Sequence, residues 1–293
     1  MAFNIQTFKT RASTAAIFVV IMLVGLLWNH WSFFILFSII HFGCWHEYQK
    51  LVGLIDPEYQ QIKPLQKYGV MIAGWAFMLA MAGPAYSIGG LNLHSIGMLL
   101  LLVSGVVLPL WLILLTKNFS VKSLVYSLAG LLYISLSWGL MIGIRSRGLI
   151  AQGSHVFLDT GWVIPIVLIA SIWINDTMAY IVGSFIGKTP FSKISPKKTW
   201  EGTAGGAILC VAVVSLGGYY FFHLNDIVTL IVISVIAAVV GTAGDLLESK
   251  LKRMAGVKDS GQIMPGHGGF LDRFDSLVLA TPFVWLYVFL FGL

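Results

Sequence analysis

The chain has 293 residues, of which 58% are hydrophobic and only 10% are charged, and its formal net charge is +6. Its mean hydropathy is +0.88, and the apolar residues come in long runs separated by short polar breaks. This composition excludes an ordinary soluble protein and indicates an integral membrane protein with little chain left for a soluble domain.

The apolar runs have the length of membrane-spanning helices, which need about 20 residues each. They do not alternate with period two, as the strands of a membrane barrel would, so we predict helices. The polar pair Asn29-His30 favours two helices rather than one in the first long run. The predicted fold class is all-α and polytopic, with about nine spans at approximately 13–28, 31–48, 68–84, 95–115, 123–144, 160–186, 203–222, 227–247 and 276–292.

An N-terminus in the cytoplasm puts 16 of the 18 lysine and arginine residues on the cytoplasmic side of these spans. Only Arg145 and Arg147 fall on the opposite side, where the C-terminus also lies. Cytoplasmic loops of membrane proteins are enriched in basic residues, so we predict this orientation. The basic side suits anionic lipids and anionic substrates, whereas loops this short argue little for nucleic acid.

We expect one membrane-embedded domain over residues 1–293, with a helical scaffold half at 1–150 and a catalytic half at 170–293. Eight of the twelve acidic residues fall after residue 170, and all of these but Asp226 project to the predicted cytoplasmic side. The first helix is expected to be retained, because no small-residue cleavage pattern follows it. Cys44 and Cys210 lie in apolar surroundings and are expected to be inert packing residues rather than disulfide or zinc ligands.

The first polar cluster of the second half is WINDTMAYIVGSFIGK, residues 173–188, which places Asn175 and Asp176 well inside a predicted span. A carboxylate at that depth costs about 2.5 to 3.5 kcal/mol on insertion scales, so it should face protein, ions or water. A buried hydrogen bond between helices is the alternative interpretation.

The second cluster is SKISPKKTWEG, residues 192–202, just before the seventh predicted span. Ser195 and Thr199 offer hydroxyl groups, and Lys197 and Lys198 bring two cations to the start of a helix. Free N–H groups and side-chain cations that point at the same place form a phosphate-binding site. Ordinary cytoplasmic lysines would explain the charge alone.

The third and fourth clusters border the last predicted span. In GDLLESKLKR, residues 244–253, Asp245 and Glu248 are one helical turn apart, and two basic residues follow. Residues 256–276 contain a basic-acidic pair, a glycine-rich turn, and two aspartates three residues apart. Gly268 and Gly269 would let backbone N–H groups approach a ligand closely, although one of the aspartates could simply cap the helix.

Asp245, Asp272 and Asp275 are hard oxygen ligands, with lysines nearby and no thiolate. This donor set suits Mg²⁺ held between protein carboxylates and substrate phosphates, and it does not suit zinc. A second cation is compatible with the same site. A salt-bridge network without a metal is the alternative.

The stretch SKLKRMAGVKDSGQIMPGHGGFLDRFD, residues 249–275, resembles the signature of the phosphatidate cytidylyltransferases, also called CDP-diacylglycerol synthases. That signature reads Ser-x-apolar-Lys-Arg, four residues, Lys-Asp, and then His-Gly-Gly-apolar-x-Asp-Arg-apolar-Asp. SPKKTWEG and WINDTMAY are similar to two further segments of the family, so the resemblance covers residues 173–282. Met264 and Asn175 depart from the family pattern, but neither removes a charge.

The resemblance implies a magnesium-dependent nucleotidyltransferase of phospholipid biosynthesis. Such an enzyme transfers the cytidylyl group of CTP to phosphatidic acid and releases pyrophosphate and CDP-diacylglycerol. It implies CTP, phosphatidic acid and membrane lipids as partners, no nucleic acid, and a site that faces the cytoplasm from a bacterial plasma membrane. A homodimer is compatible with it.

The predicted site residues fall into three groups by role. Mg²⁺ is expected on Asp245 and Asp272, with Asp275 completing or supporting the site. Charge clamps for CTP and the lipid phosphate are expected at Lys197, Lys198, Lys252, Arg253, Lys258 and Arg273. Contacts to the sugar, the base or neighbouring site residues are expected at Ser195, Thr199, Asp259, His267, Asn175 and Asp176. The residues expected to be catalytic are Asp245, Asp272, Lys258 and Arg273.

Two other functions use similar parts. A CTP-dependent lipid-alcohol kinase would transfer the γ-phosphoryl group instead of the cytidylyl group. An ion-coupled transporter would use Asp176 as a coupling site near the membrane midplane. The lack of internal repeats and the clustering of acidic residues at one face favour the enzyme.

Overall fold

The computed structural model describes residues 5–115, 120–152, 155–192, 194–224, 226–263 and 268–292. The chain divides into two compact units. The first comprises Met1–Trp162 with Met254–Arg273, and the second comprises Val163–Arg253 with Phe274–Leu293. The expected halves at 1–150 and 170–293 differ from these units chiefly at Met254–Arg273, a late segment that belongs with the N-terminal part of the chain.

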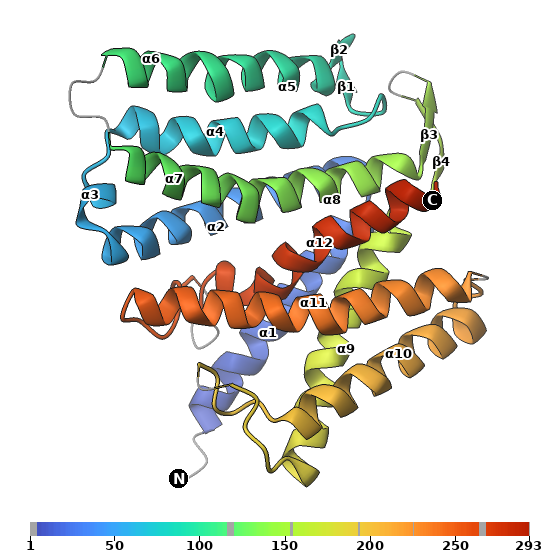
Figure 1. Cartoon of the computed structure of the whole chain (residues 1–293). Coiled ribbons are helices and arrows are strands. Elements are labelled where there is room, and N and C mark those ends of the chain that lie inside the picture. Colours follow the sequence, from blue (N-terminus) through green and yellow to red (C-terminus); the bar gives the residue numbers. More distant parts are fainter. Residues whose placement is uncertain are drawn as a thin grey trace. The chain divides into compact units, whose positions relative to one another are not determined.

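The first unit is helical except for two short antiparallel hairpins, β1-β2 and β3-β4 (Figure 1). Its helices before the first hairpin are α1 (Ile5–Leu27), α2 (His30–Ile55), α3 (Pro57–Gln60) and α4 (Pro64–Ala80). The first hairpin is β1 (Ser87–Ile88) and β2 (Leu91–Asn92). Two long helices follow, each with a π-helical segment: α5 (Leu93–Leu102), η1 (Val103–Val107) and α6 (Leu108–Leu115), then α7 (Val121–Gly130), η2 (Leu131–Ser135) and α8 (Leu136–Arg147). The second hairpin is β3 (Leu149–Gln152) and β4 (His155–Asp159).

The predicted break at Asn29-His30 is confirmed. Asn29 adopts an extended backbone and caps α2, because its Oδ1 accepts a hydrogen bond from the Ser32 backbone N at 2.8 Å. Ser32 returns the interaction, since its Oγ accepts from the Asn29 backbone N at 3.1 Å. This reciprocal cap satisfies backbone donors that a helix start otherwise leaves without partners, and it separates α1 from α2.

The core of the first unit packs around polar atoms of α2 and η2. The Ser135 hydroxyl accepts a hydrogen bond from Trp45 Nε1 at 2.8 Å and lies 3.1 Å from His41 Nε2. Gly74 of α4 lies against the same hydroxyl, because a Cβ there would come within 2.0 Å of it. At the other end of α8, buried Arg145 makes two hydrogen bonds, at 2.5 and 2.6 Å, to Asp159 of β4.

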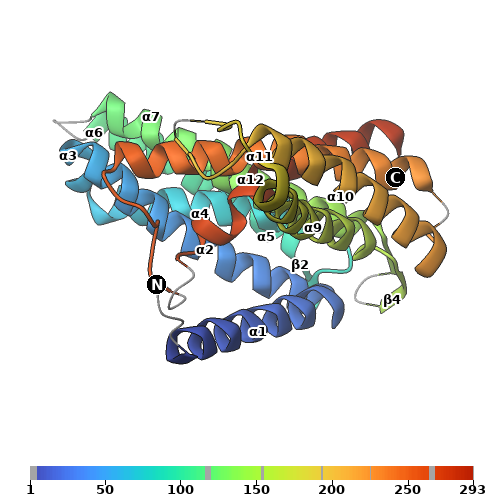
Figure 2. The same ribbon diagram turned by 90° about the horizontal axis from the view of Figure 1, so that it is seen from below.

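The second unit consists of α9 (Val163–Ile186), α10 (Trp200–Phe221), α11 (Ile227–Met254) up to its last residue, and α12 (Leu271–Phe291) after its first turn. Helices α9 and α10 lie side by side in both ribbon views (Figures 1 and 2). Small residues permit the close approach, since a Cβ at Gly206 would lie 2.7 Å from the Ala179 Cα atom. Packing through small residues is the usual way in which membrane helices meet.

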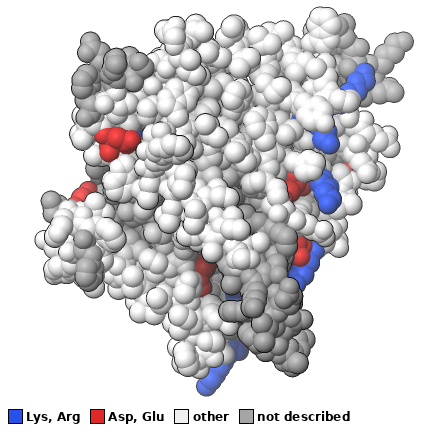
Figure 3. Space-filling model, turned by 180° about the vertical axis from the view of Figure 1, so that it is seen from behind, with Lys and Arg blue, Asp and Glu red and all other residues white. Residues whose placement is uncertain are grey.

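Six helices of the described residues are long and apolar enough to cross a membrane. They are Leu93–Leu114, Val121–Arg147, Val163–Ile186, Trp200–Tyr220, Ile227–Met254 and Leu271–Phe291. The all-α membrane fold is therefore confirmed, while the count of nine and the orientation stay predictions. Figure 3 shows a face on which charged side chains are sparse, as expected for a surface covered largely by lipid.

Candidate functional site

Asn175 and Asp176 lie on α9 in the second unit. Asn175 is buried, and its Oδ1 has no hydrogen-bond partner among the residues that the structure describes. A buried carbonyl oxygen without a partner is costly, so such atoms usually meet water, an ion or a ligand. Asp176, one residue later, is exposed.

The segment between α9 and α10 is fixed by the first turn of α10. Thr199 caps this helix, because its Oγ1 accepts a hydrogen bond from the Gly202 backbone N at 3.1 Å. The Glu201 carboxylate accepts from the Thr189 hydroxyl at 2.7 Å and from the backbone N atoms of Lys188 and Thr189 at 3.1 Å each. Glu201 therefore holds the segment in place, a role that sequence reasoning did not assign to it.

A pocket of about 460 Å³ in the second unit brings together three of the predicted clusters. Its wall comes from α9, the α9–α10 segment, α10 and α11. Seven predicted site residues line it: Asn175, Asp176, Ser195, Lys197, Lys198, Thr199 and Asp245. Hydroxyl groups, two lysines and two carboxylates thus border one cavity, and the volume falls within the range that small-molecule sites occupy.

Asp245 is the acidic residue of α11 in this pocket. Its Oδ2 pairs with the Lys198 ammonium group, and its Oδ1 accepts a hydrogen bond from Ser249 Oγ at 3.2 Å. Both side chains of the pair are partly exposed, at 28% for Lys198 and 27% for Asp245. Lys198 and Asp245 can therefore separate and each bind a ligand, because neither charge would then be buried without compensation.

Asp275 of α12 lies close to Asp245. Helices α11 and α12 approach through Gly244, where a Cβ would lie 2.5 Å from the Asp275 carbonyl oxygen. Asp245 follows Gly244 directly, and the charges of Asp176 and Asp245 both act on the Asp275 carboxyl group. The second unit therefore concentrates negative charge around the pocket.

The oxygen atoms of this region fit Mg²⁺ by chemical type, since Mg²⁺ prefers carboxylate and carbonyl oxygens. The unpartnered Asn175 Oδ1 and the partly exposed Asp245 carboxylate are such donors. Within either unit, the described residues contain no group of three or more His, Cys, Asp or Glu side chains placed to hold a metal ion. The predicted ligand set of Asp245, Asp272 and Asp275 stays a prediction.

The two basic residues at the end of α11 differ in their surroundings. Lys252 is 11% exposed and pairs with buried Glu248 one turn earlier on the same helix. Arg253 is exposed. A lysine that neutralises a buried carboxylate has a structural role, so Arg253 is the more accessible of the two predicted charge clamps.

The remaining predicted residues belong to the first unit. Asp272 opens α12, and its Oδ2 accepts hydrogen bonds from the backbone N atoms of Ser260 and Gly269, both at 2.8 Å. The Ser260 hydroxyl donates to the same oxygen at 2.9 Å. Asp272 therefore links Ser260 to the residues at the start of α12. Its bond to the Gly269 N–H group agrees with the alternative that one of the aspartates caps this helix.

Glu47 of α2 holds the same segment, and sequence reasoning missed it. Its buried carboxylate accepts hydrogen bonds from the backbone N of Phe270 at 2.8 Å and of Leu271 at 2.9 Å. The Ser260 hydroxyl lies 2.7 Å from the second carboxylate oxygen. Glu47 and Asp272 thus share Ser260 as a common partner. Only the placement of a carboxylate inside an apolar stretch hinted at this role.

The glycines of the segment make room for these two carboxylates. A Cβ at Gly261 or Gly269 would come within 2.2 Å of Glu47 Oε1. Gly268 has a φ of +84°, which favours glycine, and a Cβ there would lie 2.5 Å from Asp272 Oδ2. We expected Gly268 and Gly269 to admit a ligand, whereas the Gly269 N–H group donates to Asp272.

Three other predicted residues of this segment, Lys258, Asp259 and Arg273, are exposed. His267 lies outside the described residues. The predicted residues are thus divided between the second unit, where seven of them line the pocket, and the segment that Glu47 and Asp272 hold in the first. Their union in one catalytic site stays a prediction.

The chain is similar to known proteins, and one family model matches nearly all of it. A family model described as the cytidylyltransferase family matches residues 9–291. A phosphatidate cytidylyltransferase of Synechocystis sp. is 45% identical over 131 residues, which are 45% of each chain. One of Staphylococcus haemolyticus is 39% identical over 171 residues, 57% of this chain and 60% of that one. Phosphatidate cytidylyltransferase 4, chloroplastic, of Arabidopsis thaliana is 36% identical over 146 residues, 50% of this chain and 37% of that one. The matched part therefore spans about half of these relatives.

Proposed function

The chain belongs to the cytidylyltransferase family, and we propose that it transfers the cytidylyl group of CTP to phosphatidic acid, giving CDP-diacylglycerol and pyrophosphate. The observation that supports this most directly is the pocket of the second unit. It gathers Lys197, Lys198 and Asp245 from segments that are far apart in the sequence. Cations for phosphate groups and oxygen atoms for a divalent cation are the two requirements of nucleotidyl transfer.

The lysines of the pocket provide binding and charge neutralisation. Lys197 is exposed and Lys198 is partly exposed, so both ammonium groups are accessible to a triphosphate. Two unit charges of the same sign at about 4 Å repel by about 4 kcal/mol at an effective dielectric of about 20. The meeting of a nucleotide with an anionic lipid therefore needs such cations.

The lipid phosphate supplies the nucleophile itself. A phosphomonoester has a second pKa of about 6, so phosphatidic acid is largely dianionic at neutral pH. One of its oxygens forms a bond to the α-phosphorus of CTP while the bond between the α- and β-phosphates breaks, and pyrophosphate leaves. This nucleophile needs no general base, so no residue is assigned that role.

We propose that Mg²⁺ binds Asp245 and Asp272, with Asp275 completing or supporting the site. Asn175 Oδ1, which is buried without a partner in the described part of the chain, is a further oxygen donor of the pocket. When bound, Mg²⁺ would neutralise phosphate charge and make the α-phosphorus more electrophilic. The function of the aspartates is to hold that charge next to the lysines of the pocket.

The nucleotide and lipid substrates define the setting of the reaction. The family and the apolar helices imply a membrane environment with one soluble and one lipid reactant. We place the site at the cytoplasmic face of a bacterial plasma membrane, because the basic residues that predict the orientation flank the same segments. Assembly into a homodimer stays a prediction.

The experiment that tests the proposal follows the label of CTP. Purified protein is incubated with phosphatidic acid, Mg²⁺ and CTP labelled at either the α- or the γ-phosphate. We expect the α-label in the lipid and the γ-label in pyrophosphate. A γ-label in the lipid would identify a lipid kinase, and uptake of a solute into proteoliposomes without CTP consumption would identify a transporter.

A further inference from the structure

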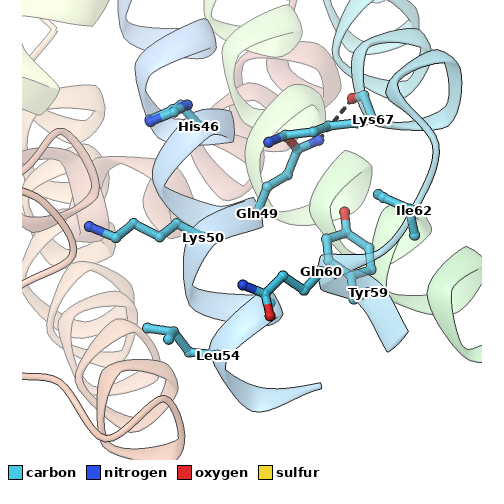
Figure 4. Close-up of a pocket in the computed structure, with 9 residues that line it drawn as sticks. His46, Gln49, Lys50, Leu54, Tyr59, Gln60, Ile62 and Lys67 are labelled. Carbon is cyan, nitrogen blue, oxygen red and sulfur yellow. Dashed lines mark hydrogen bonds between the residues drawn. The ribbon is translucent and has the colours of Figure 1, made fainter. Parts of the chain in front are cut away.

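The first unit contains a pocket of about 330 Å³, and none of the predicted site residues in the described part of the chain lines it. Its wall comes from α2, from α3, from the connection between α3 and α4, and from the first turn of α4 (Figure 4). Figure 4 shows His46, Gln49 and Lys50 projecting from α2, with Tyr59 of α3 nearby and Lys67 extending from α4 toward α2. We call this cavity the basic pocket.

The charge of the basic pocket is positive. Lys50 and Lys67 line it together with His46, and no aspartate or glutamate is among the lining residues that the structure describes. Uncompensated basic side chains at a cavity attract anions, because each adds to a local positive potential.

The acidic residues nearest in the sequence are engaged elsewhere. Asp56 pairs with Lys122 of α7 at 2.8 Å, and Glu58 accepts a hydrogen bond from the Ser120 hydroxyl at 3.0 Å. Glu47 binds the segment before α12. The carboxylates around this pocket therefore serve other contacts and do not neutralise its lysines.

Neutral polar groups complete the wall. Gln49 is buried, and its amide Nε2 donates a hydrogen bond to the Lys67 carbonyl oxygen at 2.9 Å, which ties α4 to α2. Tyr59 is buried, and burial raises the pKa of its hydroxyl group. The hydroxyl therefore stays protonated at neutral pH. Protonated hydroxyl, amide and ammonium groups are the usual partners of phosphate oxygens.

An apolar pocket of about 250 Å³ lies in the same unit, and α4 contributes to its wall as well. Gln66 lines the apolar pocket, while the next residue, Lys67, lines the basic one. The apolar wall includes Leu108 and Leu112. A ligand that carries a phosphate next to a hydrocarbon chain matches both cavities, whereas a free anion matches only the basic one.

We propose that the basic pocket binds the phosphate group of an anionic glycerophospholipid, with an acyl chain of that lipid in the apolar pocket. The predicted topology places Lys50 and Lys67 on the cytoplasmic side, beside the spans predicted at 31–48 and 68–84, and basic pockets next to membrane helices on that side bind such headgroups. The site lies in the first unit and recognises a phosphate group with an acyl chain but no nucleotide, so it does not depend on cytidylyl transfer. It would bind both lipids that are substrates of the reaction and lipids that are not.

Lipid binding without CTP tests the proposal. The full-length protein is titrated with phosphatidylglycerol in phosphatidylcholine nanodiscs, and bound lipid is counted by native mass spectrometry. Phosphatidylglycerol is a phosphodiester and lacks the phosphomonoester that the proposed reaction needs. We expect the double variant Lys50→Gln with Lys67→Gln to weaken binding about 25-fold, since each lysine near an anionic lipid contributes about fivefold.

The matched control removes two lysines that line neither cavity, Lys63→Gln with Lys250→Gln, and should bind within about twofold of the parent. Lys50 is exposed, so Lys50→Gln alone is expected to fold and to weaken binding about fivefold. Equal binding by Lys50→Gln and the parent would overturn the proposal. Competition by inorganic phosphate as strong as that by phosphatidylglycerol would also overturn it, because the site would then recognise a free anion. Label transfer from CTP is measured separately, so either proposal can fail alone.

Discussion

Replacing Glu47 by glutamine should release the segment before α12. The carboxylate accepts hydrogen bonds from the Phe270 and Leu271 backbone N atoms, and its Oε2 lies 2.7 Å from the Ser260 hydroxyl, whose one proton it shares with Asp272. A hydrogen bond to a charged acceptor contributes about 1.5 to 3 kcal/mol. Glutamine retains one acceptor oxygen and turns an amide donor toward the remaining donors. We therefore expect a local loss of about 2 to 4 kcal/mol, which raises the open population of the segment roughly 30-fold to 1,000-fold.

Hydrogen exchange measures this opening directly. The backbone amides of Phe270 and Leu271 should exchange faster in Glu47→Gln by about the same factor, while amides of α10 should keep their parent rates. Cytidylyl transfer should fall as well, since Asp272 belongs to the released segment. The control Glu58→Gln makes the same chemical change at an exposed residue and should alter neither quantity. Parent-like exchange at residues 260–271 in Glu47→Gln would refute the reasoning.

Three further predictions concern separate parts of the chain. Lys198→Gln should lower kcat/KM for CTP about 100-fold, because it removes a cation of the pocket and the partner of Asp245. The control is Lys188→Gln, and parent-like kinetics of Lys198→Gln would contradict the prediction. Asn29→Ala should lower the free energy of unfolding by about 1 kcal/mol without changing transfer, and unchanged thermal stability would show that the cap between α1 and α2 is dispensable. The hydrogen bond from Lys122 lowers the pKa of Asp56, so Asp56 should stabilise the fold above about pH 4 and lose this contribution as the pH falls further. The difference in thermal midpoint between the parent and Asp56→Asn should therefore shrink in acid, and a constant difference would argue against the pair.

The helices were predictable because the hydrophobic runs are long and their polar ends are abrupt. The division at Asn29 followed from a helix-capping residue in an otherwise apolar stretch, and the structure confirms it. The hairpins β1-β2 and β3-β4 were not predicted. Their strands are short, and Asp159 of the second hairpin pairs with Arg145 of the preceding helix, a contact that no local pattern shows.

The pocket of the second unit was predicted better than the surroundings of the signature segment. Asn175, Lys198 and Asp245 could be singled out because polar residues inside or beside apolar spans need a reason. Glu47 could not be assigned, because its partner Ser260 is 213 residues away in the sequence. No local pattern carries information about a hydrogen bond over that separation.

The glycine-rich turn shows the same limit. Its composition predicted that backbone N–H groups there approach another group closely, and the backbone does lie close to two carboxylates. The sequence suggested a ligand, whereas the charged groups present there are the carboxylates of Glu47 and Asp272. Asp272 accepts from the Gly269 N–H group that a ligand was expected to use, and Glu47 accepts from the N–H groups of the next two residues, Phe270 and Leu271.

The most direct test of the central claim is the transfer of α-label from CTP to phosphatidic acid by Asp245→Asn, measured over a range of Mg²⁺ concentrations. The control is Asp226→Asn, which changes an exposed aspartate at the start of α11 and retains a side chain that can cap a helix. If Asp245 holds the charge that activates CTP, its variant should lose about 100-fold or more of the transfer at every Mg²⁺ concentration, while the control keeps the parent rate. Transfer by Asp245→Asn within about twofold of the parent would place the reaction outside this pocket.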